Sequence, residues 1–282
     1  MHESYLHSII RRFTYHKRGA FCFCLLAVFI VLAIIAPLIA PYEPTEISAS
    51  FAAPPSAEHW LGTDQIGRDI LSRLLYGMRV SLFVGVMATL VSTVIGTVLG
   101  LISGYFGGVA DMIIMRIADM LMSFPYILLV LVSAMIVGPG MWNIILILGI
   151  VDWPGVARLV RGSVMEIRSS DFVHSSEIAG MPRRYILFSD IMPNIISPVL
   201  VFASSVMAQS ILDESALSFL GMGVQPPQAS LGNMLNDAQS LTVLTSMPWL
   251  WLPPGVMIIL IVVCVNFVGD AFRDAIDSTM TR

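Results

Sequence analysis

Four acidic residues are the side chains of this sequence that are best placed to do chemistry, because each falls in or beside an apolar stretch. Carboxylates at membrane depth are costly and commonly mark ion or proton pathways. A relay of such acids would make the chain an ion-coupled secondary transporter, which is one alternative. We favour a plainer interpretation, in which the acids sit at a helix irregularity beside Pro154 or at the outer membrane interface. They are Asp119, Asp152, Asp213 and Glu214.

The remaining reactive side chains favour neither metal chemistry nor nucleotide chemistry. Cys22 and Cys24 are two residues apart and would not share a helix face, and Cys264 lies far along the chain. A phosphate-binding loop needs a glycine-rich turn that leads into Lys-Ser or Lys-Thr. The single lysine, Lys17, is followed by Arg18. We therefore expect no enzyme activity, no cofactor, no metal site and no nucleic acid partner in this chain.

The composition indicates a protein that crosses the lipid bilayer several times. Apolar residues make up 56% of the 282 positions and charged residues 12%, which is roughly half the charged fraction of soluble domains. Backbone groups in lipid must pair within their own segment, so apolar runs of about 20 residues predict helices. We expect an all-α fold with six transmembrane helices, at residues 20–40, 81–104, 114–137, 142–161, 195–214 and 248–269.

The basic residues predict how these helices are oriented. Cytoplasmic loops carry the excess of Lys and Arg. With both chain ends in the cytoplasm, all but three of the 15 basic residues fall on that side, the exceptions being Arg68, Arg73 and Arg79. We expect an N-in, C-in protein of a cytoplasmic membrane. Its cytoplasmic ends would be residues 1–19 and 270–282, and its outer loops residues 41–80 and 215–247.

The second predicted span carries a ladder of small residues at four-residue spacing. Small side chains let two helix backbones approach closely where lipid gives no hydrophobic drive for association. We expect the ladder to pack against another helix of the same chain, with a contact to a second subunit as the alternative. Its members are Ser92, Gly96, Gly100 and Gly104.

A polar stretch precedes that span on the outer side. Thr63 or Asp64 can cap a helix. Apolar residues at helical spacing then run from Ile66 to Met78 as a single stripe. We expect an amphipathic helix that lies along the outer membrane face.

On the cytoplasmic side, residues 162–194 form a polar and basic loop between the fourth and fifth spans. Ser170 or Asp171 can cap a short helix, and Gly180 permits a sharp turn at its end. Pro182 suits the first turn of a second helix. Apolar side chains here would fill a groove of a soluble partner, and charged ones would pair with it. The candidate docking residues are Asp171, Phe172, Val173, Glu177, Ile178, Gly180, Met181, Arg183, Arg184 and Pro193.

Three long runs stand in order along the chain and carry a family resemblance. They are His59–Ser81, Glu214–Leu235 and Asn266–Asp277, supplemented by Met115-Arg-Ile-Ala-Asp119 and Ser123-Phe-Pro125. With these runs the chain resembles permease subunits of peptide-type ABC importers, the dipeptide, oligopeptide and nickel group. Within a permease pair it is most similar to the C-type subunit, and the resemblance covers nearly the whole chain.

The resemblance implies a type I ABC importer permease fold in a bacterial inner membrane, with residues 81–269 as the permease core. The chain would form half of a translocation pathway. Its partners would be a homologous second permease, two ATP-binding subunits that hold ATP and Mg²⁺, and an extracytoplasmic substrate-binding protein. Di- and oligopeptides are the substrates expected, with a nickel or other metal chelate and glutathione as alternatives.

The same resemblance gives the cytoplasmic loop a role. Permeases of this superfamily carry a Glu-Ala-Ala motif, followed by Gly at the seventh position and Pro at the twentieth. Gly180 and Pro193 match that spacing, whereas His174-Ser175-Ser176 replaces Glu-Ala-Ala. Glu177 lies three residues further on and does not stand in for the missing acid. The resemblance therefore implies a coupling helix that docks on an ATP-binding subunit.

Overall fold

The computed structural model of the chain describes residues 17–276, and the remainder of the predicted cytoplasmic ends, 1–16 and 277–282, lies outside that range. Every regular element among the described residues is helical. In chain order they are α2 (Lys17–Ile39), α3 (Ile70–Phe106), α4 (Gly108–Ser123), α5 (Tyr126–Val137), α6 (Met141–Arg168), α7 (Asp171–Ile178), α8 (Arg183–Tyr185), the π-helical turn η1 (Ile186–Ile191), α9 (Met192–Phe219), α10 (Leu231–Leu235), the 3-10 turn η2 (Asn236–Gln239), α11 (Leu241–Ser246) and α12 (Pro248–Ile276).

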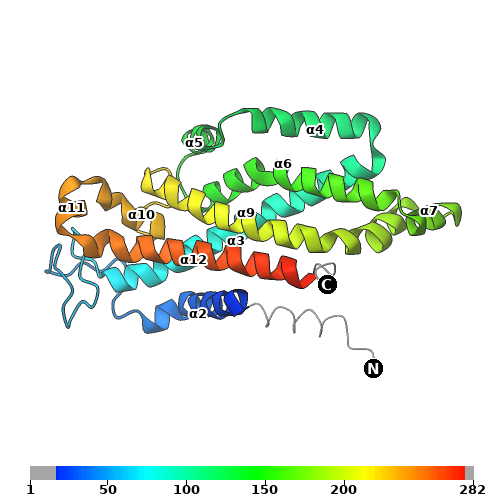
Figure 1. Cartoon of the computed structure of the whole chain (residues 1–282). Coiled ribbons are helices and arrows are strands. Elements are labelled where there is room, and N and C mark those ends of the chain that lie inside the picture. The colour runs from blue at the N-terminus through cyan, green and yellow to red at the C-terminus, as the bar shows by residue number, and fades with distance from the viewer. Residues whose placement is uncertain (1–16, 277–282) are drawn as a thin grey trace, which may run out of the picture.

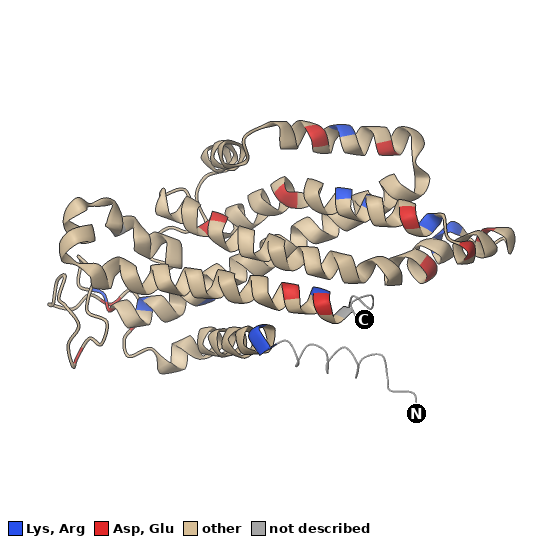
Figure 2. Ribbon diagram, in the orientation of Figure 1, with Lys and Arg blue, Asp and Glu red and all other residues tan. Residues whose placement is uncertain are grey.

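Four long helices, α3, α6, α9 and α12, form an elongated bundle, and α2 packs on its side against α12 and α3 (Figure 1). Helix α7 extends from one end, whereas α10, α11 and the loop of residues 40–69 lie at the opposite end. Figure 2 shows no charged residue along the middle of α2 or α12. Within the described part of the chain, five helical segments are long and apolar enough to cross a membrane, or six if α4 and α5 count as one. The predicted all-α, multi-pass fold is confirmed.

The third predicted span, residues 114–137, is not one straight helix. Helices α4 and α5 are bent by 93° at the break between them. Phe124 is extended at that break, with φ −86° and ψ 146°, because the residue before a proline is disfavoured in helical conformation. The α4–α5 arm stands beside the bundle (Figure 1), and α4 carries charged residues along its length (Figure 2).

The predicted amphipathic helix on the membrane face is wrong. From Ile70 onward its stripe belongs to the first turns of α3, which runs without interruption from residue 70 to residue 106, whereas Ile66 precedes the helix and is exposed. The cap is Asp69 rather than Thr63 or Asp64, and its carboxylate accepts the Ser72 N–H at 2.8 Å. The stripe does not lie on lipid because other helices of the chain cover it.

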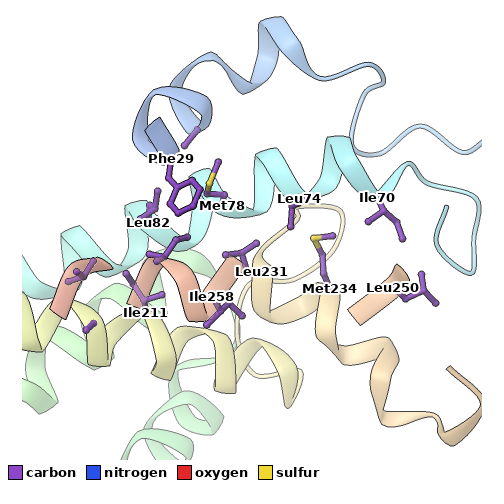
Figure 3. Packing of buried hydrophobic residues seen from close by; sticks show 14 of the residues in the cluster. Phe29, Ile70, Leu74, Met78, Leu82, Ile211, Leu231, Met234, Leu250 and Ile258 are labelled. Carbon is purple, nitrogen blue, oxygen red and sulfur yellow. The ribbon is translucent and has the colours of Figure 1, made fainter. Parts of the chain in front are cut away.

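The core at the outer end of the bundle shows what covers that stripe. Ile70, Leu74 and Met78 point toward side chains of α2, α9, α10 and α12 in one buried cluster (Figure 3). Phe29 lies over Met78, and Leu231 of the short helix α10 reaches the same cluster. This cluster therefore packs α2, α3 and the short helix α10 together at the outer end of the bundle.

The small-residue ladder of α3 packs against α6 of the same chain. A Cβ placed on Gly100 would lie 2.6 Å from the Cβ of Val160 and 2.7 Å from the Ala157 carbonyl oxygen. Gly96 and Gly104 are equally close to α6, facing its valines one turn before and one turn after Val160. Ser92 is buried at the start of the ladder. Helix α6 of the same chain thus occupies the glycine face of the ladder.

We expect the substitution Gly100→Ala to destabilise the protein by about 1–3 kcal/mol, because the added methyl group overpacks a rigid backbone contact. The measurement is thermal unfolding of the detergent-purified chain. Gly162→Ala is the matched control, since a Cβ at Gly162 of α6 meets no atom within 4 Å. Equal unfolding temperatures for the two variants would contradict the assignment of the ladder to tight helix packing.

Candidate functional site

The candidate docking segment begins with helix α7 at the end of the bundle (Figure 1). Ser170 is the N-cap by backbone conformation, but its hydroxyl donates to the Ile167 carbonyl oxygen at 2.5 Å and does not cap α7. Asp171 occupies the first turn, where a negative charge is favourable near the positive end of the helix dipole. The helix is therefore started by backbone geometry and charge.

Gly180 closes α7 with a Schellman turn. Its φ is +72°, in the region that disfavours other L-residues. The Gly180 N–H donates to the Glu177 carbonyl oxygen at 3.0 Å, and the Met181 N–H to that of Ser176 at 3.1 Å. This is the hydrogen-bond pattern of a glycine-terminated helix. The backbone conformation alone accounts for glycine here, since no atom lies within 4 Å of where a Cβ would stand.

The chain then re-enters the bundle earlier than the sequence predicts. Pro182 caps α8 from outside instead of occupying its first turn, and its carbonyl oxygen accepts the Tyr185 N–H at 2.8 Å. Helix continues from residue 183 through η1 into α9, so the loop is shorter than 162–194. Pro193 lies in the first turn of α9. Because proline lacks an N–H and crowds the preceding turn, the π-helical turn before it accommodates the ring.

One apolar candidate faces inward, which corrects its predicted role. Val173 is fully buried, in a cluster with Val164 of α6 and Ile186 and Ile191 of η1. The sequence grouped it with the docking side chains, because the short segment shows no periodicity that separates its two faces. Val173 instead anchors α7 to the bundle.

Among the predicted docking residues, the exposed apolar side chains are Phe172, Ile178 and Met181. Ile178 is the most exposed, at 88%. Ile178 and Met181 lie next to the tight turn at Gly180, and Phe172 lies in the first turn of α7. We call these three residues the tip surface. Large exposed apolar groups in a water-facing position indicate an interaction site.

Some of the charged candidates contact other residues of the chain, and others are exposed. The Arg183 guanidinium lies over the Phe106 ring of α3, 5.8 Å from its centroid, so this arginine ties the segment to the bundle. The His174 ring nitrogen Nδ1 lies 3.5 Å from a Glu177 carboxylate oxygen, and both side chains are partly exposed. Asp171 and Arg184 are exposed as well.

The four acids of the membrane region do not form one chain. Asp119 pairs with Arg158 at 2.5 Å. The Tyr126 hydroxyl donates to Asp213 at 2.7 Å, and Asp152 lines a cavity of about 290 Å³ with Tyr126 and Gln209. Pro154 does not interrupt α6, and Asp213 and Glu214 are buried in the protein rather than at an outer interface. No local pattern pointed to Tyr126, because its partner is 87 positions away.

Glu214 joins two of the long sequence runs. Its carboxylate is fully buried and accepts the hydroxyls of Ser81 and Ser218, each at 2.7 Å. The Ser81 hydroxyl also accepts the Leu231 N–H at 3.2 Å. The run 59–81 therefore meets the run 214–235 at this carboxylate, and hydroxyl donors offset the cost of burying it.

The outer run 59–81 is held by two further buried carboxylates. Asp69 lies 3.0 Å from the His59 ring nitrogen Nδ1 and also accepts the Ser72 hydroxyl at 2.7 Å. Asp64 accepts from Arg68 Nε at 2.6 Å and lies 3.5 Å from an Arg73 nitrogen. These contacts lock the loop before α3, so the polar residues that make them are structural.

Comparison with known proteins agrees with this architecture. Residues 96–282 match the family described as binding-protein-dependent transport system inner membrane component, and residues 4–55 match the N-terminal transmembrane domain of oligopeptide transport permease C. A dipeptide transport system permease protein of Alkalihalophilus pseudofirmus is 41% identical over 89% of this chain and 83% of its own length. An oligopeptide transport system permease protein of Haemophilus influenzae is 39% identical over 95% and 86%.

A solved structure supports the fold. The chain superimposes on the MetNI methionine ABC transporter in an inward-facing conformation with a TM-score of 0.57 and 19% identity. The match covers 70% of this chain and 93% of that one. The fold is therefore that of a type I importer permease.

We expect Ser81→Ala to destabilise the chain by about 1–3 kcal/mol, because a buried carboxylate and a backbone N–H each lose a partner. Ser133→Ala is the control, since the Ser133 hydroxyl donates to the Leu129 carbonyl oxygen of its own helix at 2.7 Å. Thermal unfolding of both purified variants measures the difference. A Ser81 variant as stable as the Ser133 variant would disprove the structural role of the Ser81–Glu214 contact.

Proposed function

This chain belongs to the family of binding-protein-dependent transport system inner membrane components, and from that premise we propose that it forms half of the translocation pathway of an ATP-driven importer of di- or oligopeptides. A homologous second permease supplies the other half, and a substrate-binding protein delivers the peptide on the outer side. Two separate ATP-binding subunits bind ATP and Mg²⁺ and drive transport. The observation that carries the proposal is the tip surface of α7.

The geometry of α7 suits a helix that is moved by a separate subunit. One face, through Val173, is packed into the cluster of α6, η1 and α9, while Phe172 and Ile178 remain exposed. A partner that binds the exposed side chains can therefore move the membrane helices α6 and α9 together. Of the residues predicted to dock, Phe172, Ile178, Met181 and Arg184 fit this role. Val173 and Arg183 instead hold α7 against the bundle.

Peptides are the proposed substrates because the two relatives described above are named as dipeptide and oligopeptide permeases. The match of residues 4–55 to an oligopeptide permease domain agrees with them. The alternative of an ion-coupled transporter is less well supported. A relay needs its groups within hydrogen-bond reach of one another, whereas Asp119 and Glu214 are each held by separate partners.

We expect uptake of a labelled dipeptide by the complete complex in proteoliposomes to require both ATP and the binding protein. Dissipating the proton gradient with an ionophore is expected to leave the rate unchanged, because ATP hydrolysis supplies the driving force. Uptake that persists without the ATP-binding subunits, and that collapses with the proton gradient, would replace this proposal with the ion-coupled alternative.

We expect Ile178→Asp to reduce co-purification of the ATP-binding subunits at least tenfold, because a charge in a buried apolar contact costs a few kcal/mol. The variant chain itself should unfold at the wild-type temperature, since Ile178 contacts solvent in the isolated chain. Leu241→Asp is the matched control, an exposed apolar residue of α11 at the opposite end of the bundle. Unchanged co-purification of the Ile178 variant would remove α7 as the docking site.

A further inference from the structure

A cavity of about 470 Å³ opens at the outer end of the bundle. It lies where the first half of α3 and the start of α6 meet two loops, one at residues 44–45 and one at residues 227–229. Its volume falls in the range of small-molecule sites, which are concave, mainly apolar and equipped with few polar groups. The apolar part of its wall consists mainly of Pro44, Tyr76, Val80, Phe83, Met141 and Pro227.

Arg79 is the one charged residue that lines this cavity. It differs from the two other basic residues on the outer side. Arg68 and Arg73 both contact the buried Asp64, whereas Arg79 forms no ion pair with any residue in the described range 17–276. Glu43 and Glu46 flank the loop at residues 44–45, yet neither lines the cavity nor pairs with Arg79. The guanidinium is therefore available to a ligand.

The chemistry of the cavity selects a carboxylate attached to apolar groups. A guanidinium presents two parallel N–H donors that match the two oxygens of a carboxylate. The side-chain amide of Gln228 adds a neutral donor on the loop side. A short peptide with a free C-terminus combines a carboxylate with apolar side chains for the surrounding wall.

We propose that this cavity receives an incoming peptide, with Arg79 binding its C-terminal carboxylate. The inference rests on the proposed function and assigns a substrate contact within it. The position suits delivery from outside, because the cavity lies at the end of the bundle opposite α7. If Arg79 instead bound an acidic loop of the binding protein, replacing it would slow the uptake of every substrate equally. A comparison of substrates with and without a C-terminal carboxylate therefore separates the two roles.

The test compares a dipeptide with its C-terminal amide, each delivered to proteoliposomes as a saturating complex with the binding protein. The wild-type complex and the Arg79→Gln variant are measured with both substrates. We expect the substitution to lower uptake of the free acid about tenfold, which is the usual effect of losing one hydrogen bond to a charged group. Uptake of the amide should be unchanged, and Arg79→Lys should recover much of the uptake of the acid.

Arg116→Gln serves as the control, because it removes one exposed arginine of α4 outside the cavity; it should affect neither substrate. Gln228→Glu provides an independent variant in an exposed loop, and its added negative charge should slow the acid but not the amide. Equal losses of both substrates, or no loss, in the variants at 79 and 228 would overturn the carboxylate assignment while leaving peptide transport intact. Absence of any peptide uptake by the wild-type complex would overturn the proposed function as well.

Discussion

The close approach of α3 and α6 is the contact on which the rest of the structure depends. Lipid provides no hydrophobic drive for helix association, so the two helices must gain their stability from van der Waals contact at short range. Glycine at residues 96, 100 and 104 lets three valines of α6 reach the α3 backbone. Helix α6 in turn holds the α4–α5 arm through Asp111–Arg161 and Asp119–Arg158.

Different kinds of interaction stabilise the two ends of this helix pair. At the outer end, Glu214 and Ser81 bring together elements that are far apart in sequence, with α10 bonded onto the same hydroxyl. At the cytoplasmic end, Val173 packing and the stacking of Arg183 on Phe106 hold α7 to the bundle. The outer end is held by buried polar bonds, whereas α7 is held by an apolar contact and a cation–π contact.

Particular residues show where prediction from the sequence succeeded and where it could not. The turn at Gly180 was predictable, because a positive φ is a local property of the backbone. The stripe from Ile66 to Met78 was recognised but misplaced, since periodicity identifies an apolar face without saying whether lipid or protein covers it. The inward direction of Val173 and the pairing of Tyr126 with Asp213 had no local signal at all.

The sequence by itself determined the approximate places of the apolar spans, the helix-packing ladder and the turn that ends α7. These features depend on composition or on neighbours within a few residues. The tertiary structure alone decided which side of α7 stays exposed, which acids are satisfied and why Arg79 has no carboxylate partner within residues 17–276 while Arg68 and Arg73 share one. Those outcomes depend on contacts such as Ser81 with Glu214, between residues 133 positions apart, which no local pattern encodes.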